Sequence, residues 1–179
     1  MKRRMKRKTM NPFDLQRTLD TMEIIIDSRE HPTAEAAKRW KSFGCPYVIE
    51  ALKSGDYSAR FTLPNGEIFD MRDKVVFERK MDLTEICGNF CQNRERFVRE
   101  FERMKETGAK CYILIENGSW EKAFAGKYRS QMKPKALVAS LCAWAARYNA
   151  HIVFCRPETT PYLMKEILYR EAKEILENY

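Results

Sequence analysis

The chain reads Val75-Val76-Phe77-Glu78-Arg79-Lys80 near its middle, an apolar run that ends in three charged side chains. β-Branched and aromatic residues in such a run predict a buried strand. Because side chains alternate across a strand, Glu78 and Lys80 point to one face and Arg79 points to the other. Earlier in the chain, a turn at Gly55-Asp56 can bring a second carboxylate to that face. Two carboxylates and an ammonium group on one rigid edge suit a divalent cation, an attacking water and a scissile phosphate.

Strands alternate with helices along the rest of the chain. Apolar runs predict strands at residues 23–27, on both sides of a turn in 47–63, and at 74–79, 110–116 and 152–155. Helical periodicity and capping residues predict helices at 32–42, 83–104 (divided near Gln92-Asn93), 134–148 and 159–179. The triplet Pro64-Asn65-Gly66 predicts a hairpin turn. This alternation predicts an α/β domain with a central mixed sheet flanked by helices.

Five short segments resemble the motifs of one nuclease family. Asp27-Ser28-Arg29-Glu30, Gly55-Asp56 and Glu78-Arg79-Lys80 resemble the DxRE, GD and ERK signatures of the XPF-type structure-specific endonucleases. That family belongs to the PD-(D/E)xK nuclease superfamily. Further along, Arg96-Phe97-Val98-Arg99-Glu100 is similar to the family's Arg-apolar-apolar-x-Gln segment, and Ile113-Leu114-Ile115-Glu116 to its apolar strand ending in Glu. The resemblance implies a restriction-endonuclease-like fold.

The resemblance, which covers about residues 23–170, also implies a metal-dependent active site. Asp56 and Glu78, with Asp27 as a further ligand, are expected to hold Mg²⁺ or Mn²⁺. The metal would lower the pKa of a bound water and polarise a phosphate oxygen. Lys80 is expected to orient the nucleophile or to stabilise the negative charge that grows in the transition state.

The other charged motif residues each have two interpretations. As the family suggests, Arg79 either supports the site or binds a phosphate. Alternatively, it holds the sheet edge through a salt bridge. Arg29 and Glu30 are expected behind the metal ligands, where they can pair with each other. Arg96 is a phosphate contact by resemblance, or part of a solvated helix face. The expected catalytic set is Asp27, Asp56, Glu78, Arg79 and Lys80.

One position departs from the family's pattern. The family usually places an Asp four residues after the motif lysine, and this chain has Thr84 there. Asp82 and Glu85 lie close by in the sequence. Either acid can take the role of the missing Asp, or the position is dispensable.

Positive charge is concentrated at the N-terminus. Residues 1–22 carry seven Lys or Arg against two Asp, so they account for +5 of the formal net charge of +8 and the rest of the chain for +3. This composition predicts a flexible basic arm over residues 1–22, followed by the nuclease domain over 23–179. The arm either binds phosphates or is a solvated tail.

A second basic stretch lies inside the domain and is interleaved with aromatic residues. Its members are Lys122, Phe124, Lys127, Tyr128, Arg129, Lys133 and Lys135. Such a stretch can grip DNA, and its alternative is a solvated loop.

Length and composition exclude several other classes of protein. The 179 residues suit one domain, and 44% hydrophobic with 32% charged residues is typical of a globular chain. No apolar run approaches the roughly 20 residues that span a bilayer. The basic N-terminus lacks the apolar segment of a secretory signal, so an intracellular protein is expected, in the cytoplasm or nucleoid. Six cysteines within apolar runs are expected to be free thiols rather than zinc ligands or disulfides.

The expected function is therefore that of a Mg²⁺-dependent endodeoxyribonuclease acting on branched DNA in recombination, repair or replication. A homodimer or heterodimer fits the family, and the chain length suits a phage or mobile-element origin. Two alternatives stay open. One is a non-catalytic DNA-binding pseudonuclease subunit, favoured by Thr84 and opposed by the intact Asp56, Glu78 and Lys80. The other is a restriction- or repair-type nuclease acting on ordinary duplex or on RNA.

Overall fold

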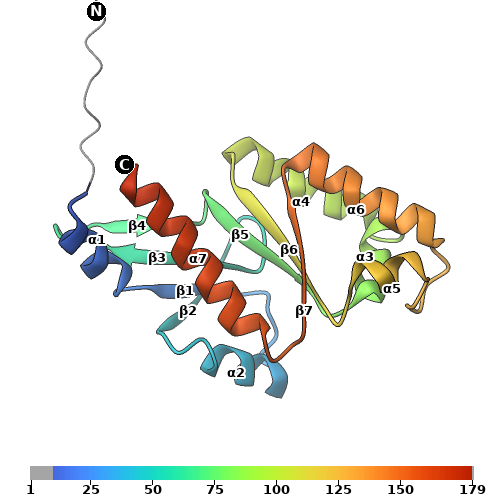
Figure 1. Cartoon of the computed structure of the whole chain (residues 1–179), viewed down its shortest axis with the longest axis horizontal. Helices are drawn as coiled ribbons and strands as arrows, with labels where there is room; N and C mark the ends of the chain where they lie inside the picture. Colours follow the sequence, from blue (N-terminus) through green and yellow to red (C-terminus); the bar gives the residue numbers. More distant parts are fainter. Residues whose placement is uncertain (1–9, 179) are drawn as a thin grey trace, which may run out of the picture.

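A seven-stranded mixed sheet runs through the part of the chain that the structure describes, residues 10–178 of a computed structural model (Figure 1). The strand order is β2-β1-β3-β5-β6-β7, and β4 pairs with β3 outside this path. β3 is antiparallel to β1 and β5, whereas β5, β6 and β7 are mutually parallel. The strands are β1 (Glu23–Asp27), β2 (Tyr47–Glu50), β3 (Tyr57–Thr62), β4 (Ile68–Asp70), β5 (Val75–Lys80), β6 (Lys110–Glu116) and β7 (His151–Cys155). The α/β class and the mixed sheet are thus confirmed.

Helices cover both faces of this sheet. They are α1 (Pro12–Leu19), α2 (Ala34–Lys41), α3 (Leu83–Phe90), α4 (Arg94–Thr107), α5 (Trp120–Phe124), α6 (Pro134–Tyr148) and α7 (Thr160–Glu177). The predicted division near Gln92-Asn93 is confirmed, because α3 ends and α4 begins on either side of it. None of the helices in residues 10–178 is long and apolar enough to cross a bilayer. All six cysteines are free thiols in the structure.

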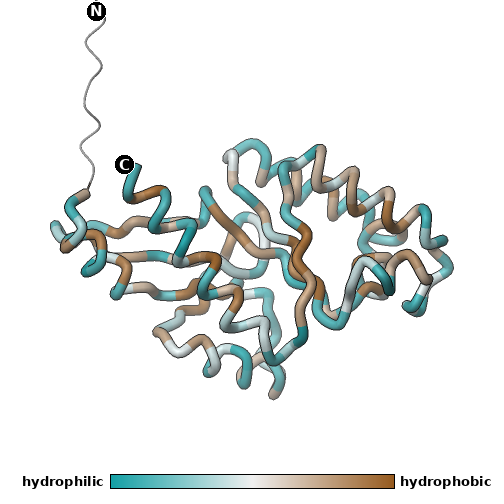
Figure 2. Tube along the Cα trace, in the orientation of Figure 1, coloured by the Kyte–Doolittle hydropathy of each residue, from teal (hydrophilic) through white to brown (hydrophobic). Residues whose placement is uncertain are grey.

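Two hydrophobic cores lie on opposite sides of the sheet. Helices α1, α2 and α7 pack against one face, which includes Val75 and Phe77 of β5. Helices α3, α4 and α6 pack against the other face, which includes Val76. Hydrophobic residues concentrate along β5, β6 and β7, where the two cores meet the same strands (Figure 2). Because β5 is covered on both sides, the charged residues at its end are carried into the interior.

The segment from residue 10 to residue 22 differs from the flexible arm expected there. It contains α1, which Asn11 caps by accepting a hydrogen bond from the backbone N–H of Asp14. Leu15 and Leu19 on this helix are buried in the core beside α7. The apolar positions at a spacing of four outweigh the polar composition of the segment. Residues 1–9, which hold six of the seven Lys and Arg of residues 1–22, lie outside the described residues.

Replacing Leu19 with Ala should show that α1 belongs to the folded domain. Leu19 is only 2% exposed, so its truncation should lower the free energy of unfolding by about 2–5 kcal/mol. Urea unfolding measures this loss. Arg17→Ala, on the exposed side of the same helix, should change the free energy of unfolding by less than about 1 kcal/mol. Equal, small effects of both substitutions would contradict the packing of α1.

Candidate active site

Strand β5 places two opposite charges side by side in the interior. Glu78 and Lys80 lie on the same face, 3% and 6% exposed, and Lys80 Nζ is 2.6 Å from Glu78 Oε1. Lys80 Nζ also lies 3.7 Å from Glu85 Oε1 and 5.4 Å from the centre of the Phe97 ring. The ammonium is therefore held from three sides, by two carboxylates and by one aromatic face.

A tight turn brings Asp56 next to this pair. Gly55 has φ +76°, and a Cβ there would approach Phe77 O to 2.9 Å, so only glycine fits without strain. The backbone N–H of Asp56 donates to Phe77 O at 2.7 Å, and Asp56 Oδ2 accepts the N–H of Arg79 at 2.7 Å. These bonds tie the turn to β5. The sequence expectation that Asp56, Glu78 and Lys80 meet agrees with this geometry.

The three groups strongly influence each other's protonation. Burial raises the pKa of Glu78 to about 7, a shift that Lys80 opposes and Glu100 increases. Burial and the charge of Glu78 raise the pKa of Asp56 well above its ordinary value. Burial lowers the pKa of Lys80, but Glu78 and Asp56 outweigh it, so the net pKa is raised. The ammonium stays charged while the carboxyl groups compete for it, and a further cation would relieve this competition.

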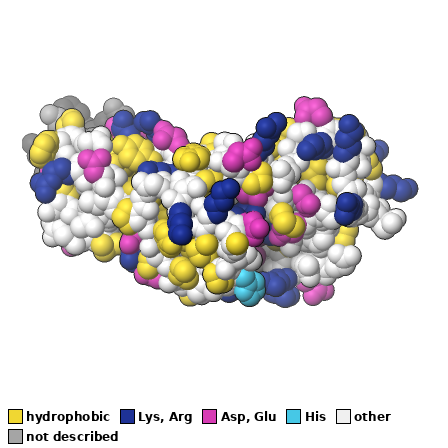
Figure 3. Space-filling view, turned by 90° about the horizontal axis from the view of Figure 1, so that it is seen from below, with side chains coloured by type: hydrophobic (Ala, Val, Ile, Leu, Met, Phe, Trp, Pro, Cys, Tyr) yellow, Lys and Arg dark blue, Asp and Glu magenta, His cyan; other side chains and the backbone are white. Residues whose placement is uncertain are grey.

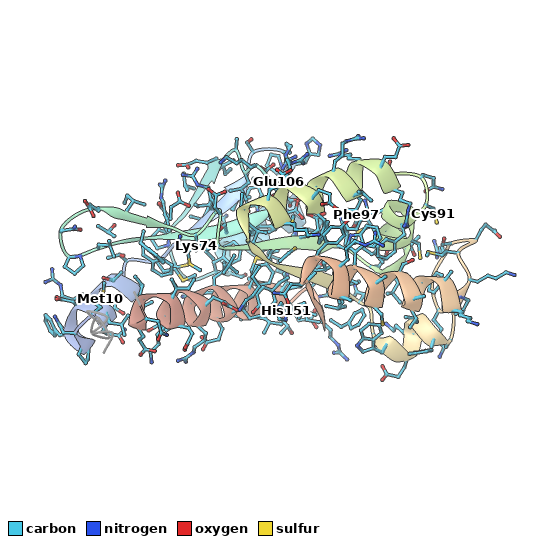
Figure 4. The ribbon with its side chains drawn as sticks, turned by 90° about the horizontal axis from the view of Figure 1, so that it is seen from above. Met10, Lys74, Cys91, Phe97, Glu106 and His151 are labelled. Carbon is cyan, nitrogen blue, oxygen red and sulfur yellow. The ribbon has the colours of Figure 1, made fainter. Side chains whose placement is uncertain are left out.

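Helices α3 and α4 close the site into a pocket of about 250 Å³. Figure 4 labels Phe97 on α4 at this place and Cys91 beyond the end of α3. Glu100 of α4 reaches across and accepts the N–H of Gly55 at 3.2 Å. The pocket is lined by Arg29, Glu30, Asp56, Glu78, Lys80, Glu85, Asn89, Asn93, Arg96, Phe97 and Glu100. Five carboxylates thus face three cations.

The comparisons with known proteins agree with this fold. Residues 26–164 match the ERCC4 domain, which is most of the chain. The chain belongs to the ERCC4 family. The expectation of an XPF-type nuclease domain is confirmed by this match. No match to the chain was found among the curated proteins.

Solved structures similar to this ERCC4 domain include two of XPF from Aeropyrum pernix. The first has a TM-score of 0.58 at 17% sequence identity and covers 81% of this chain and 64% of that chain. The second is described as a complex with DNA, has a TM-score of 0.59 at 19% identity, and covers 86% of this chain and 66% of that chain. This chain therefore spans slightly less than two thirds of each of these structures.

The pocket of this ERCC4 domain has the donors that a divalent cation needs. Glu78 Oε2 is buried and has no hydrogen-bond partner, so one lone-pair face of a carboxylate is left for a ligand. Asp56 uses its Oδ2 to accept the N–H of Arg79, and it lines the same pocket as Glu78. Within residues 10–178, no three acidic, His or Cys side chains form a ready-made metal cluster. Mg²⁺ commonly takes one or two carboxylates and completes its shell with water and substrate phosphate, so two carboxylates fit it.

Asp27 does not join these residues. Asp27 is buried, 1% exposed as a residue, and its Oδ1 accepts hydrogen bonds from the backbone N–H and Nε of Arg29. Its Oδ2 accepts the backbone N–H of Leu52 at 2.7 Å. Oδ1 thus holds the turn after β1 and Oδ2 the segment after β2, and Asp27 is not among the residues that line the pocket. The expectation that Asp27 is a further metal ligand stays a prediction; in the structure its carboxylate anchors these two segments.

Arg29, Glu30 and Arg96 all line the pocket, but Arg29 and Glu30 do not pair with each other. Arg29 pairs with Asp27 rather than with Glu30. Glu30 accepts a hydrogen bond from the Tyr57 hydroxyl at 3.0 Å. Arg96 lies at the pocket with an exposed side chain, as a phosphate contact requires.

The structure distinguishes the two acids near Thr84. Asp82 caps α3 by accepting the backbone N–H of Glu85, whereas the Glu85 side chain lines the pocket near Lys80. Glu85 is therefore the acid that can take the place of the family's Asp. Sequence reasoning assigned no role to Asn89, Asn93 or the Glu100 carboxylate, although the spacing of four residues between Glu85 and Asn89 on one predicted helix was a usable signal.

Arg79 lies on the opposite face of β5 and contacts Glu116 rather than the pocket. Its Nη2 and Nε lie 2.5 and 3.1 Å from the two oxygens of Glu116, which is 1% exposed. The Thr160 hydroxyl donates to Glu116 Oε1 at 2.7 Å. This arrangement matches the salt-bridge interpretation of Arg79.

Arg79→Met should therefore act on stability. It leaves the Glu116 carboxylate buried without its guanidinium partner, so the free energy of unfolding should fall by about 3–5 kcal/mol in urea unfolding. The double variant Arg79→Met with Glu116→Gln removes the unpaired charge and should regain more than half of that loss. Unchanged stability of the single variant, together with lost cleavage, would instead place Arg79 in the reaction.

Proposed function

We propose that this ERCC4 domain is a metal-dependent DNA endonuclease that hydrolyses phosphodiesters at branched DNA, such as forks, flaps and junctions. The observation that carries the proposal is the convergence of Asp56, Glu78 and Lys80 in one pocket, where Glu78 Oε2 has no partner. The DNA-bound XPF of similar fold supports DNA as the partner. Repair, recombination or replication is the proposed context, in an intracellular setting and with a second copy or a related subunit.

Each residue of the pocket has a distinct task in this proposal. Asp56 and Glu78 would hold Mg²⁺ or Mn²⁺, which supplies an acidic water and polarises the phosphate when bound. Lys80, kept charged by its carboxylate neighbours, donates hydrogen bonds to the oxygen that gains negative charge. Arg96 and Arg29, exposed at the pocket, hold phosphates of the bound strand. Asp27 has no place in this set.

Of the two alternatives, the pseudonuclease subunit is the less compatible with the pocket. A protein that only binds DNA has no use for a buried carboxylate oxygen without a partner, since such an atom costs stability. A nuclease for ordinary duplex or RNA would use the same three residues, so substrate preference separates it from the proposed activity. The phosphate-binding role of residues 1–9 stays a prediction.

The deciding experiment is cleavage of end-labelled forks, 3′ flaps, four-way junctions, duplex, single strands and an RNA duplex, with Mg²⁺, Mn²⁺ or EDTA. We expect cutting that depends on the metal, because the five carboxylates of the pocket outnumber its three cations, and that favours branched DNA. Glu78→Gln keeps the side-chain size but removes the charge, so cutting should fall to the EDTA level. Titration with Mn²⁺, followed by electron paramagnetic resonance, should show at least about ten-fold weaker metal binding in this variant. DNA binding without cutting in either metal would support the pseudonuclease.

Lys80→Met tests the role of the ammonium group separately from metal binding. Methionine keeps most of the volume beside Phe97 but cannot donate a hydrogen bond, so kcat should fall by about 100-fold or more. Mn²⁺ affinity should be kept or increased, since a cation beside Glu78 is removed. Lys105→Met, at an exposed position on α4, serves as the matched control with unchanged kcat. Retained cleavage by Lys80→Met would exclude the proposed role.

A further inference from the structure

A second hollow lies on the other side of α3 from the active-site pocket. Its volume is about 680 Å³, against about 250 Å³ for the pocket. The residues that line it come from α3, from the turn after α3 and from the loop before α6. They belong to Thr84, Gly88, Cys91, Gln92, Tyr128, Arg129, Ser130, Gln131 and Met132. We refer to this hollow as the α3 groove.

Helix α3 is the wall between pocket and groove. Glu85 and Asn89 line the pocket, whereas Thr84 and Gly88 line the groove. A helix with its side chains is about 10 Å across, so one helix separates the two sites. Since each strand of DNA rises about 3.4 Å per phosphate, about three nucleotides cover that distance. A strand cut in the pocket can therefore continue into the groove.

The charge at the groove is strongly positive. Residues 117–135 carry five Lys or Arg against Glu121 alone. Lys127, Arg129 and Lys133 are exposed, and among residues 10–178 none of them forms an ion pair. Figure 3 shows Lys and Arg side chains at the end of the molecule that α3, α5 and α6 form in Figure 1. Arg129 lines the groove and Lys127 lies next to Tyr128 in the same loop, so unpaired cations are available there to neutralise phosphates.

The groove lining suits an unpaired strand. Tyr128 offers a ring whose hydroxyl is fixed by donating to Met132 O at 2.8 Å. Gln92 and Gln131 offer amide donors and acceptors at the same surface. Sites that bind single-stranded nucleic acid commonly combine an aromatic ring for base stacking with cations that contact the phosphates. The volume is that of a small-ligand pocket, about 300–1,000 Å³, which admits one or two nucleotides and not a double helix.

The loop that carries these groups is attached to α3 by its backbone. The N–H of Arg129 donates to Thr84 Oγ1 at 3.2 Å, which leaves the Arg129 side chain free. Thr84 is also the position where the family usually has Asp. A neutral hydroxyl here keeps a negative charge out of the groove, where it would repel a phosphate.

Gly88 leaves the floor of the groove open. A Cβ at this position would meet only Gln92 Oε1, at 3.6 Å, so packing does not require glycine. Glycine inside a helix costs about 0.5–1 kcal/mol relative to alanine. Glycine at position 88 therefore lowers the stability of α3, and packing in the fold does not explain why it is present.

We infer that the α3 groove binds the unpaired DNA strand next to the cleavage position, so that the enzyme favours substrates with a single-stranded tail. The inference rests on the proposed nuclease function. It adds that the α3 groove selects one part of the substrate, the single-stranded tail. Phosphates would lie along Lys127 and Arg129, and a base would stack on Tyr128.

The test compares Gly88→Leu, which fills the groove, with Gly88→Ala, which does not. Substrates carry tails of 0, 2, 4, 6 and 8 nucleotides of either polarity beside the cut. Wild type and Gly88→Ala should show a KM about ten-fold lower once one tail reaches about four nucleotides. Gly88→Leu should cut the tailless substrate normally and lose this advantage. Thermal unfolding checks that both variants fold.

A second pair of variants tests charge instead of shape and leaves the backbone attachment intact. Lys127→Ala with Arg129→Ala should weaken binding of the tailed substrate and reduce its salt slope by about 1.4, at about 0.7 per phosphate on single strands. The matched control is Lys41→Ala with Lys105→Ala, two exposed cations on α2 and α4. The control should keep the wild-type dependence on tail length.

The outcomes separate the inference from the proposed function. Cleavage by wild type with no dependence on tail length, or Gly88→Leu equal to Gly88→Ala, would overturn the groove and leave the nuclease proposal standing. Absence of cleavage by wild type on every DNA would remove the proposed function, and the inference with it.

Discussion

The alternation of side chains along β5 is the constraint on which the rest of the structure depends. This strand is covered by helices on both faces, so every side chain that it carries must be accommodated in one of two cores. Its last three residues are charged, and each needs a buried partner. Lys80 pairs with Glu78 on one face, and Arg79 pairs with Glu116 on the other. A shift of one residue would exchange the two faces, which would take Glu78 and Lys80 away from Asp56 and Arg79 away from Glu116.

The two pairs have different consequences because their surroundings differ. On the Arg79 side, Glu116 receives two hydrogen bonds from the guanidinium and one from Thr160, so its charge is well compensated. On the other side, several carboxylates share one buried ammonium, and Glu78 keeps an oxygen without a partner. Buried ion pairs add little net stability even when complete. The incomplete pair therefore fits the proposed cation site better than a role in folding.

The motif residues were predictable to the extent that they lie on strands. Strand periodicity was sufficient to place Glu78 and Lys80 together and Arg79 opposite them, and Gly55 required the turn that brings Asp56 to β5. The contacts of Asp27 were not predictable, because it is the last residue of β1 and its carboxylate holds the backbone of Arg29 and Leu52, which no strand periodicity contains. Helix α1 was missed because its two buried leucines lie among polar residues. The pocket side of α4 and the groove beyond α3 depend on helix packing, which no local pattern contains.

Glu100 shows how a small departure from a motif changes the electrostatics of a site. The family usually has Gln at this place, and both side chains can accept the N–H of Gly55, as Glu100 does here. The turn that holds Asp56 is therefore supported in either case. A carboxylate, however, adds a negative charge that raises the pKa of Glu78. Without a cation, this charge favours a protonated pocket, whereas with a divalent cation it strengthens the attraction between the metal and the site. Replacing the amide by a carboxylate thus leaves the geometry of the turn unchanged and makes the ionisation of the pocket depend more strongly on the metal.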